Sequence, residues 1–383
     1  MVSNSNDYSL EYKKAGVDTL ASQKLIESLK PYANKTLTKN VISGIGGFSA
    51  LYDLSFLKEY KKPILLTSTD GVGTKLNYAS FFKRYETIGY DLVAMCANDI
   101  LVNGGKPYIF LDYLSVDRLH VEEMSIVLRS ISAACKLINC SLIGGETAEH
   151  PNTKKHQNDF DLAGFMIGFC EQEKLLTYDN IQKGDIVIGV PSSGIHSNGV
   201  SLIRKIFFDP NDPKEENKEE VLAFVKESIL LQPTILYEPI LRPLLEENLI
   251  KGLVHITGGG FYENIPRILK ENYYVELAKW DLEEPFDKVS NKGNLDFIEM
   301  TKIFNCGFGM LIFADKKSEA EILHILRKEI ETYKKSYIEN QKDFFYDFLE
   351  YLKDWDLKYF KQTPKVLGAV GNSEKLSKKI IFI

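Results

Sequence analysis

The sequence has few of the side chains that carry redox or zinc chemistry. It contains five cysteines, an odd number with no Cys-x-x-Cys pair, and six histidines without a His-x-x-x-His or Cys/His spacing. These patterns disfavour a disulfide framework and a zinc site. Because the cysteines sit mostly among apolar neighbours, we expect reduced core thiols in a cytoplasmic protein. Any metal is expected to have oxygen ligands.

Long hydrophobic runs are also missing. No run approaches the ~18 apolar residues needed to cross a bilayer, and residues 1–11 are polar, without the apolar core of a secretory signal. The formal net charge of -6 argues against broad binding of nucleic acid, although it leaves room for a local basic pocket. We therefore expect no membrane or nucleic-acid partner and a small anionic substrate.

What is present is a large globular chain with alternating elements. Its 383 residues, 44% of them hydrophobic, exceed one ordinary core and predict two domains. Strand-like and helix-like stretches alternate, which is typical of an α/β or mixed α+β fold. The predicted strands are 63–69, 107–114, 141–143, 163–170, 185–190 and 308–313, and the predicted helices are 86–102, 121–138, 198–208, 219–231 and 234–247. Domains are predicted over 1–172 and 173–383.

The most informative segment lies behind the apolar run Ile64–Leu66. Residues 69–76 read Thr-Asp-Gly-Val-Gly-Thr-Lys-Leu. Two glycines allow a tight turn and a close backbone approach to a ligand, Asp70 offers a hard oxygen to Mg²⁺, and Lys75 offers a point charge to phosphate. Alone, the octapeptide is equally consistent with a glycine-rich strand-to-helix turn that bears an exposed aspartate and lysine.

Five further polar clusters follow in order along the chain. They are Cys96–Asp99, Gly144–Glu149, Asp161–Phe165, Ser192–Gly199 and Ile256–Gly260. The order, spacing and wording of this series closely resemble the aminoimidazole ribonucleotide (AIR) synthetase family, the phosphoribosylformylglycinamidine cyclo-ligases. The resemblance runs from residues 12–18 to 305–307 and resumes at 366–368. An ordered series over most of the chain is far more specific than one glycine motif.

The resemblance implies an activity and an assembly. The activity is the ATP-dependent cyclisation of formylglycinamidine ribonucleotide to 5-aminoimidazole ribonucleotide, with release of ADP and phosphate, in purine biosynthesis. The assembly is a homodimer in which N-terminal domains pair into a shared barrel through residues within about 60–170, since open sheet edges are normally paired or covered. The N-terminal domain is then the ATP-binding and dimerisation domain.

The resemblance also implies a nucleotide side of the site. Its expected ATP-binding residues are Asp70, Gly71, Gly73, Thr74, Lys75, Gly145, Glu146, Thr147 and Asp161, and its expected Mg²⁺ ligands are Asp70, Asp99 and Glu146. Alternatives stay open for several of these. Asp99 could be a helix-surface charge, Asp161 could serve a turn, and Glu146 and Glu149 could cap a helix that starts after Gly145 and share its face.

The substrate side is expected to come from two glycine-bounded turns. Its residues are Ser193, Gly194, His196, Ser197, Asn198, Gly258 and Gly259. His196 could shuttle the amidine proton, because imidazole titrates near neutrality, or it could only order its loop. With Lys75 and Asp99 it completes the expected catalytic set. The rivals are another ATP-using member of the superfamily, such as thiamine-monophosphate kinase, and a noncatalytic nucleotide-binding scaffold.

Some segments depart from the family pattern. Ile235 stands where arginine is usual, and Thr301 and Lys302 replace a typical Tyr-Arg pair, which puts fine substrate contacts in question. Residues 335–362 resemble an insertion, and the helical spacing of its apolar side chains favours core or subunit contact over a cofactor site. Those side chains are Phe345, Phe348, Leu349 and Leu352.

Overall fold

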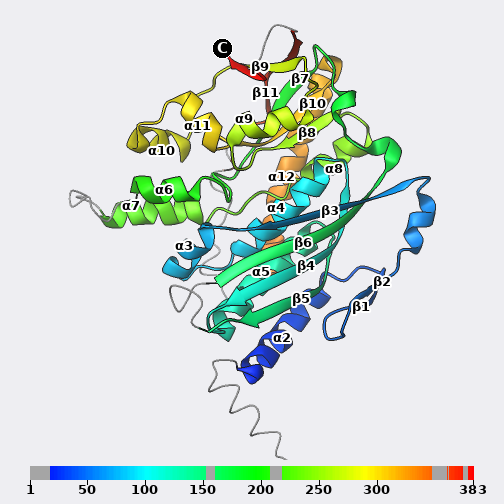
Figure 1. Ribbon diagram of the computed structural model, residues 1–383, viewed down its shortest axis with the longest axis vertical. Coiled ribbons are helices and arrows are strands. Elements are labelled where there is room, and N and C mark those ends of the chain that lie inside the picture. The colour runs from blue at the N-terminus through cyan, green and yellow to red at the C-terminus, as the bar shows by residue number, and fades with distance from the viewer. Residues whose placement is uncertain (1–17, 152–159, 208–217, 347–359, 361, 374–377) are drawn as a thin grey trace, which may run out of the picture. The chain divides into compact units, whose positions relative to one another are not determined.

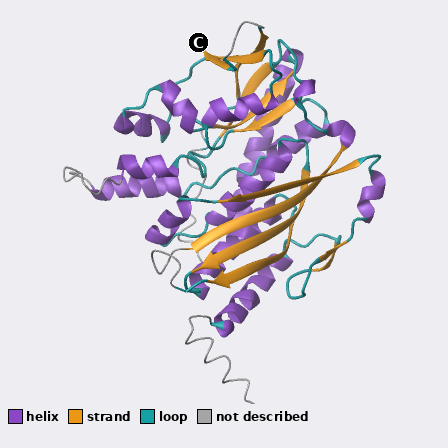
Figure 2. Ribbon diagram, viewed as in Figure 1, coloured by secondary structure: helices purple, strands orange, loops and turns teal. Residues whose placement is uncertain are grey.

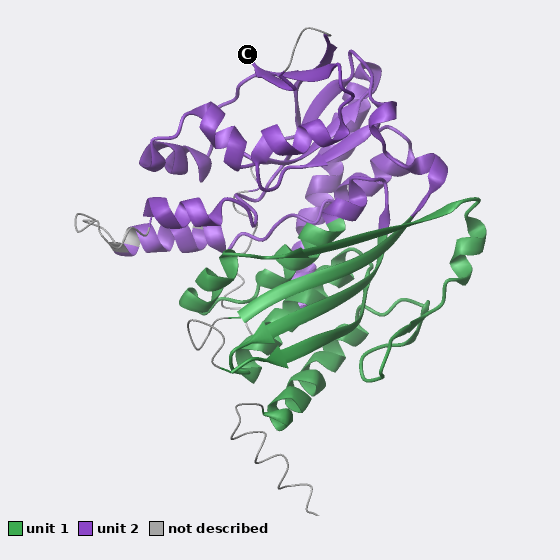
Figure 3. Ribbon diagram, in the orientation of Figure 1, with its two compact units in different colours: residues 1–97, 107–169 green, residues 98–106, 170–383 purple. Residues whose placement is uncertain are grey.

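The computed structural model describes residues 18–151, 160–207, 218–346, 360, 362–373 and 378–383. The chain forms two compact units (Figure 3), of which unit 1 comprises 1–97 and 107–169 and unit 2 comprises 98–106 and 170–383. Part of the predicted insertion, including Phe348, Leu349 and Leu352, lies outside the described residues. Each unit has its own sheet (Figures 1 and 2).

Unit 1 is built around a four-stranded sheet in the order β3-β6-β4-β5. Most of its elements match the predicted alternation, and β4 pairs with β5 in parallel. In chain order the elements are α2 (Thr19–Asn34), β1 (Val41–Ser43), β2 (Leu51–Tyr52), β3 (Pro63–Gly71), α3 (Lys75–Phe82), α4 (Ile88–Leu101), β4 (Lys106–Val116), α5 (Val121–Leu137), β5 (Ser141–Glu149) and β6 (Phe160–Glu171). Within the described residues these strands do not close into a barrel.

Helices cover one face of this sheet. Helix α5 packs against α2 and β5, and it meets α4 so closely at Gly89 that a Cβ atom there would collide with the backbone of Ser130 and Ile131. The Gly89 amide donates to the Ser130 hydroxyl at 3.0 Å. Alternate residues of the strands point toward this covered face, since a Cβ on Gly164 would meet the Phe110 ring and the Cys96 thiol.

Unit 2 is built around a six-stranded sheet in the order β12-β9-β11-β7-β10-β8. Neighbouring strands are antiparallel except for the parallel pair β9 and β12. The elements are β7 (Ile186–Pro191), α6 (Val200–Phe207), α7 (Lys218–Phe224), α8 (Glu238–Glu246), β8 (Gly252–His255), α9 (Gly260–Asn264), β9 (Tyr273–Leu277), α10 (Phe286–Gly293), α11 (Phe297–Ile303), β10 (Phe308–Ala314), α12 (Glu319–Phe344), β11 (Lys365–Asn372) and β12 (Ile380–Phe382).

Two predicted helices, and one helix that stayed open as an alternative, differ from the structure. The stretch after Gly145 is strand β5 and not a helix, because it continues the parallel ladder with β4 up to Glu149. The helix predicted over 234–247 begins only at Glu238, with Pro239 in its first turn, where a missing N–H costs little. The helix predicted over 219–231 ends in a π-helical stretch, Val225–Leu230.

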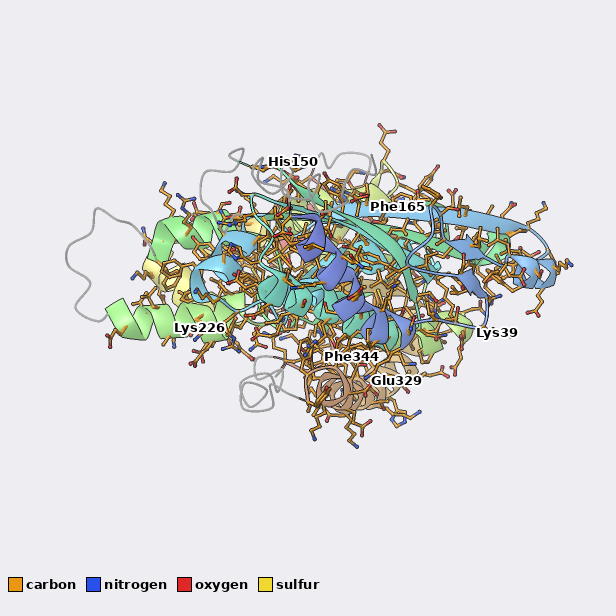
Figure 4. All side chains as sticks on the ribbon, turned by 90° about the horizontal axis from the view of Figure 1, so that it is seen from below. Lys39, His150, Phe165, Lys226, Glu329 and Phe344 are labelled. Atoms are coloured by element: carbon orange, nitrogen blue, oxygen red, sulfur yellow. The ribbon has the colours of Figure 1, made fainter. Side chains whose placement is uncertain are left out.

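Helix α12 carries the described start of the predicted insertion. Its buried stripe ends at Phe344, which Figure 4 labels together with Glu329 on the same helix. Phe345 is also buried, and the Tyr333 ring lies 6.4 Å from the Phe360 ring. For Phe345, the described member of the predicted apolar stripe, the prediction of a packing role is confirmed. Across the described part of the chain, no helix is long and apolar enough to cross a membrane.

Candidate functional site

The Thr69–Leu76 segment forms the end of β3 and the start of α3 in unit 1. Gly73 adopts the left-handed region, with φ of 69°, which lets the chain turn between strand and helix. The Asp70 carboxylate is half-buried and accepts the Gly71 amide at 2.7 Å. The predicted strand-to-helix turn is therefore present, with the carboxylate at its beginning and Lys75 at its end.

Lys75 is buried in an ion pair that the sequence did not reveal. Its Nζ lies 2.7 Å from Oδ2 of Asp91, and the two side chains are 1% and 0% exposed. Burial lowers the pKa of Lys75, and the Asp91 charge opposes that shift. Asp91 stands three residues into α4, a helix whose apolar sequence could have drawn attention to an acidic residue that needs a cation.

The two acidic residues of β5 have different surroundings. Glu146 is exposed and accepts its neighbour's amide, Thr147, at 3.0 Å. Glu149 accepts the backbone amides of Asp18 at 2.7 Å and Leu119 at 2.8 Å. Three residues apart in a strand, they point to opposite faces. Glu149 thus holds backbone segments together, whereas Glu146 is available to a ligand.

A buried carboxyl lies behind Glu146 in the same sheet. Asp112 of β4 is paired with Gly145, where a Cβ would collide with the Asp112 carboxyl. Burial raises the pKa of Asp112 to about 7, and the nearby charge of Glu146 adds to the rise. The glycine at position 145 is therefore required by the space that Asp112 occupies.

The opposite face of the unit 1 sheet carries exposed apolar and acidic side chains. Gly164 and Phe110 point to the helices, so Phe165 and Tyr113 point away from them, and these rings are 38% and 43% exposed. Figure 4 labels Phe165. Asp161 is four residues before Phe165 on β6, so its side chain points to the same face, and it is exposed. Glu146 is the register partner of Tyr113 and points to that face as well. Two of the predicted ATP-binding residues, Asp161 and Glu146, thus lie on this face, which points away from the helices and which we call the open face.

In unit 2 the predicted substrate turn Ser193–Asn198 is mostly buried. His196 is 0% exposed and has a left-handed φ of 62°. Its ring packs 6.2 Å from the Tyr237 ring, and a Cβ on Gly309 would collide with both side chains. The ring therefore has a fixed place against β10, which accords with an ordering role and equally presents a pre-oriented imidazole.

One irregular segment, 233–237, connects the polar clusters of unit 2. Ser193 donates to the Pro233 carbonyl, and the hydroxyls of Ser197 and Thr234 lie 3.2 Å apart. The Tyr237 hydroxyl donates to the Pro191 carbonyl at 2.8 Å. The Ile235 side chain, at the family's usual arginine position, is fully buried.

Asp99 lies near the end of α4, in the part of that helix (98–101) that belongs to unit 2, and has a partner in that unit. Its side chain is 47% exposed, and its Oδ1 lies 3.2 Å from Nδ1 of the buried His255. His255 ends β8, two residues before the glycine turn that begins at Thr257. His255 was not among the predicted site residues, although its place between a strand and a glycine turn was an available signal.

The second predicted substrate turn contains two left-handed glycines, Gly259 and Gly260. The Asn264 side-chain amide donates to the carbonyls of Gly258 at 3.1 Å and Gly260 at 2.7 Å, which fixes the turn. Two residues that depart from the family pattern follow later in the chain. Thr301 is buried, whereas the Lys302 ammonium lies over the Tyr262 ring.

The oxygen donors described so far fit Mg²⁺ better than a softer metal. Asp70, Glu146 and Asp99 are each at least partly accessible. Among the described residues, no three His, Cys, Asp or Glu side chains gather into a metal-binding cluster. Mg²⁺ takes one or two carboxylates and completes its shell with water and phosphate oxygens, so each of these side chains has the chemistry of a Mg²⁺ ligand.

Comparison with protein families and curated proteins gives consistent matches. The model described as "AIR synthase related protein, N-terminal domain" matches residues 53–170, and the corresponding C-terminal domain model matches 182–335. The phosphoribosylformylglycinamidine cyclo-ligase of Thermoanaerobacter pseudethanolicus is 45% identical over 80% of this chain and 90% of its own. That of Chromobacterium violaceum is 42% identical over 85% and 94%.

Solved structures share the fold at low sequence identity. Thiamine-monophosphate kinase from Stenotrophomonas maltophilia superposes with a TM-score of 0.62 at 13% identity, covering 94% of this chain and 95% of its own. The hydrogenase maturation protein HypE, solved in complex with ATP, gives a TM-score of 0.62 at 13% identity, covering 94% and 90%. These likenesses establish the mixed α/β fold.

Proposed function

Because this chain belongs to the AIR synthase family, with phosphoribosylformylglycinamidine cyclo-ligases as its relatives, we propose how its residues divide the work of that reaction. The chain is an ATP-dependent ligase of purine biosynthesis that closes formylglycinamidine ribonucleotide to 5-aminoimidazole ribonucleotide. The observation that carries this function is the high identity to cyclo-ligases over about four fifths of the chain. The likeness to thiamine-monophosphate kinase concerns the fold alone.

The chemistry sets a clear demand on the site. The formyl oxygen of the substrate is a poor leaving group until ATP phosphorylates it, after which the amidine nitrogen attacks the carbon and phosphate departs. Charge spreads over the phosphoryl oxygens during transfer, so fixed cations and donors supply most of the catalysis. A bound Mg²⁺ would neutralise phosphate charge.

For the nucleotide we propose the turn at the end of β3 and the open face of the unit 1 sheet. Asp70 and Glu146 are proposed Mg²⁺ ligands, as is Asp99 of unit 2, because all three are carboxylates whose side chains are at least partly exposed. The turn residues 71–74 and the polar groups of 145–147 and Asp161 are proposed to contact ATP. Lys75 is proposed to meet a phosphate, for which its ammonium must turn from Asp91.

For the substrate we propose the Ser193–Asn198 turn and the Gly258–Gly259 turn of unit 2. The hydroxyl and amide groups of the first turn would bind the ribonucleotide, and His196 would move the amidine proton during ring closure. The fixed position of its ring supports this role. Two further proposals concern the molecule as a whole. One is a homodimer through the open sheet face, with each nucleotide site near the subunit boundary. The other is a cytoplasmic location, which the five buried free cysteines favour.

The experiment that tests the function is a complete reaction and its omissions. Aminoimidazole ribonucleotide should form only when ATP, Mg²⁺ and formylglycinamidine ribonucleotide are all present. ATP turnover with thiamine monophosphate and no imidazole product would contradict the function.

Variants test the division of roles. Asp70→Asn and Asp99→Asn should reduce kcat/KM for Mg²⁺-ATP by about 100-fold with little effect on folding. Asp179→Asn, on the exposed surface of unit 2, is the matched control. Wild-type kinetics in both site variants would refute the ligand roles.

Lys75 and His196 need more selective designs. Lys75→Met leaves Asp91 buried without its cation, so the double variant Lys75→Met/Asp91→Leu should recover stability but not phosphate handling. His196→Asn should lower turnover and leave ATP binding unchanged. An equal loss of ATP affinity in His196→Asn would place that residue on the nucleotide side.

A further inference from the structure

The starting point is Asn98, whose side chain is fully buried and held at both ends in unit 2. Its Nδ2 donates to the Ile235 carbonyl at 2.9 Å, and its Oδ1 accepts the Tyr237 amide at 3.0 Å. Both partners are backbone groups with only one possible role, a carbonyl that accepts and an N–H that donates. The orientation of the Asn98 amide is therefore determined by its surroundings.

That orientation determines which nitrogen of His255 carries the proton. The Nε2 atom of His255 lies 3.4 Å from Asn98 Nδ2, which can only donate. Nε2 must therefore accept, and a neutral imidazole that accepts at Nε2 carries its hydrogen on Nδ1. Nδ1 lies 3.2 Å from Oδ1 of Asp99, so its hydrogen is directed to that carboxylate.

We propose that His255 is a positioning residue for Asp99, holding one carboxylate oxygen through Nδ1–H so that the second oxygen is directed to the bound magnesium nucleotide. The proposal rests on the proposed function, in which Asp99 is a Mg²⁺ ligand. A ligand carboxylate is commonly oriented by a hydrogen bond from a buried neighbour, and loss of that neighbour weakens metal binding. The contrast in exposure fits the roles, because the His255 side chain is 3% exposed and that of Asp99 47%.

The hydrogen-bond series from Asn98 through His255 to Asp99 also distinguishes a positioning role for His255 from ordinary core packing. A surface aspartate on a helix needs no buried donor, and a core histidine can satisfy Nδ1 with a backbone carbonyl. Here the donor series runs from the buried Asn98, through the strand-end His255, to a carboxylate at the surface. The backbone of 235–237 supports its inner end, so the series links Asp99 to the segment that also holds Ser193 and Ser197.

The first test measures the tautomer in the protein without nucleotide. Two-bond ¹⁵N–¹H correlation spectra of ¹⁵N-histidine-labelled protein, assigned with His255→Gln, should show His255 protonated at Nδ1. A spectrum showing the Nε2–H tautomer would overturn the proposal, because that tautomer has no hydrogen to give to Asp99.

The second test uses two amides that place their nitrogen differently. In His255→Asn the side-chain nitrogen lies near the former Nδ1, whereas in His255→Gln it reaches the former Nε2. With Mn²⁺ and ADP as the probe, electron paramagnetic resonance should show near wild-type Mn²⁺ affinity for His255→Asn and about a 10-fold loss for His255→Gln. His324→Gln, on the exposed side of α12, is the control. Equal affinities of the Asn and Gln variants would overturn the proposal.

Asp99→Asn distinguishes a failure here from a failure of the proposed function. Wild-type Mn²⁺ affinity in that variant would show that Asp99 is not a ligand, whatever the tautomer of His255. A weakened Asp99→Asn together with an unchanged His255→Gln would keep Asp99 as a ligand and reject His255 as the residue that positions it.

Discussion

The main sheets of the two units differ in how completely the chain covers their strands. In unit 2 every residue of β7, β8 and β10 is buried. In unit 1 the edge strand β3 has no buried residue, and the central strands β6 and β4 expose Phe165 and Tyr113 on one face. Strands that are buried on both faces need no further cover, whereas exposed aromatic rings on a sheet face are available to a partner. The contrast supports pairing of unit 1 with a second copy.

The largest expected effect comes from placing a charge on the open face. Phe165→Lys should convert the proposed dimer to monomers at micromolar concentration, since a buried aromatic at an interface centre contributes about 2–4 kcal/mol and a two-fold axis repeats the change. Ile338→Lys on α12 is the matched control, because Ile338 is also 38% exposed. Sedimentation velocity measures both. Dissociation of the control, or persistence of the Phe165→Lys dimer, would argue against this interface.

A smaller effect is expected from adding a methyl group to a fully buried strand of unit 2. Gly309→Ala in β10 puts a methyl group into the space of the Tyr237 hydroxyl and the His196 ring. Overpacking of this kind costs about 1–3 kcal/mol of unfolding free energy. Gly44→Ala in unit 1, where the nearest atom would lie 3.8 Å away, should change stability by less than about 0.5 kcal/mol. Urea denaturation compares the stabilities of the two variants. Equal midpoints would mean that the side chains around β10 can move aside to make room for the methyl group.

The last effect is a change in the pH dependence of stability and concerns the helix-covered face of unit 1, which should resemble the interior of unit 2. Burial raises the pKa of Asp112 to about 7, so between pH 4 and 7 the folded state keeps a proton that the unfolded chain has lost. Unfolding free energy should therefore fall as pH rises through that window and level off above it. Asp112→Asn should remove most of this dependence, which is on the order of 1.4 kcal/mol per pH unit within that window, whereas the exposed Asp179→Asn should not. Parallel pH profiles for wild type and Asp112→Asn would show that this carboxyl is hydrated.

The sequence predicted the elements whose pattern is local. Helix α5 and strand β10 match their predicted ranges closely, because the first has a clear 3.6-residue period and the second is a continuous apolar run. Strands β8, β9, β11 and β12 were not predicted. They are short or contain glycine, and long-range pairing with other strands holds them in place. The stretch after Gly145 became a strand for the same reason.

The sequence predicted the motifs of the candidate site, but it did not predict which side chains would contact one another. The glycine turns and acidic residues stand out along the chain, and the relatives confirm what the motif series indicated about family and activity. The partners of these residues are distant in sequence, as with His255 and Asp99, 156 residues apart. Asp91 lies closer to Lys75, but its role appears only once two helices bury both charges. Such contacts depend on tertiary packing.

The molar mass of the protein in solution most directly tests whether a second copy covers the open face of unit 1. If a second copy covers the open face of unit 1, light scattering at micromolar concentration should give twice the chain mass of 43.6 kDa, and hydrogen exchange should show the β6 and β4 amides protected in that species. A mass of 43.6 kDa with full cyclo-ligase activity would contradict the account, because the open sheet face would then be exposed in the working enzyme.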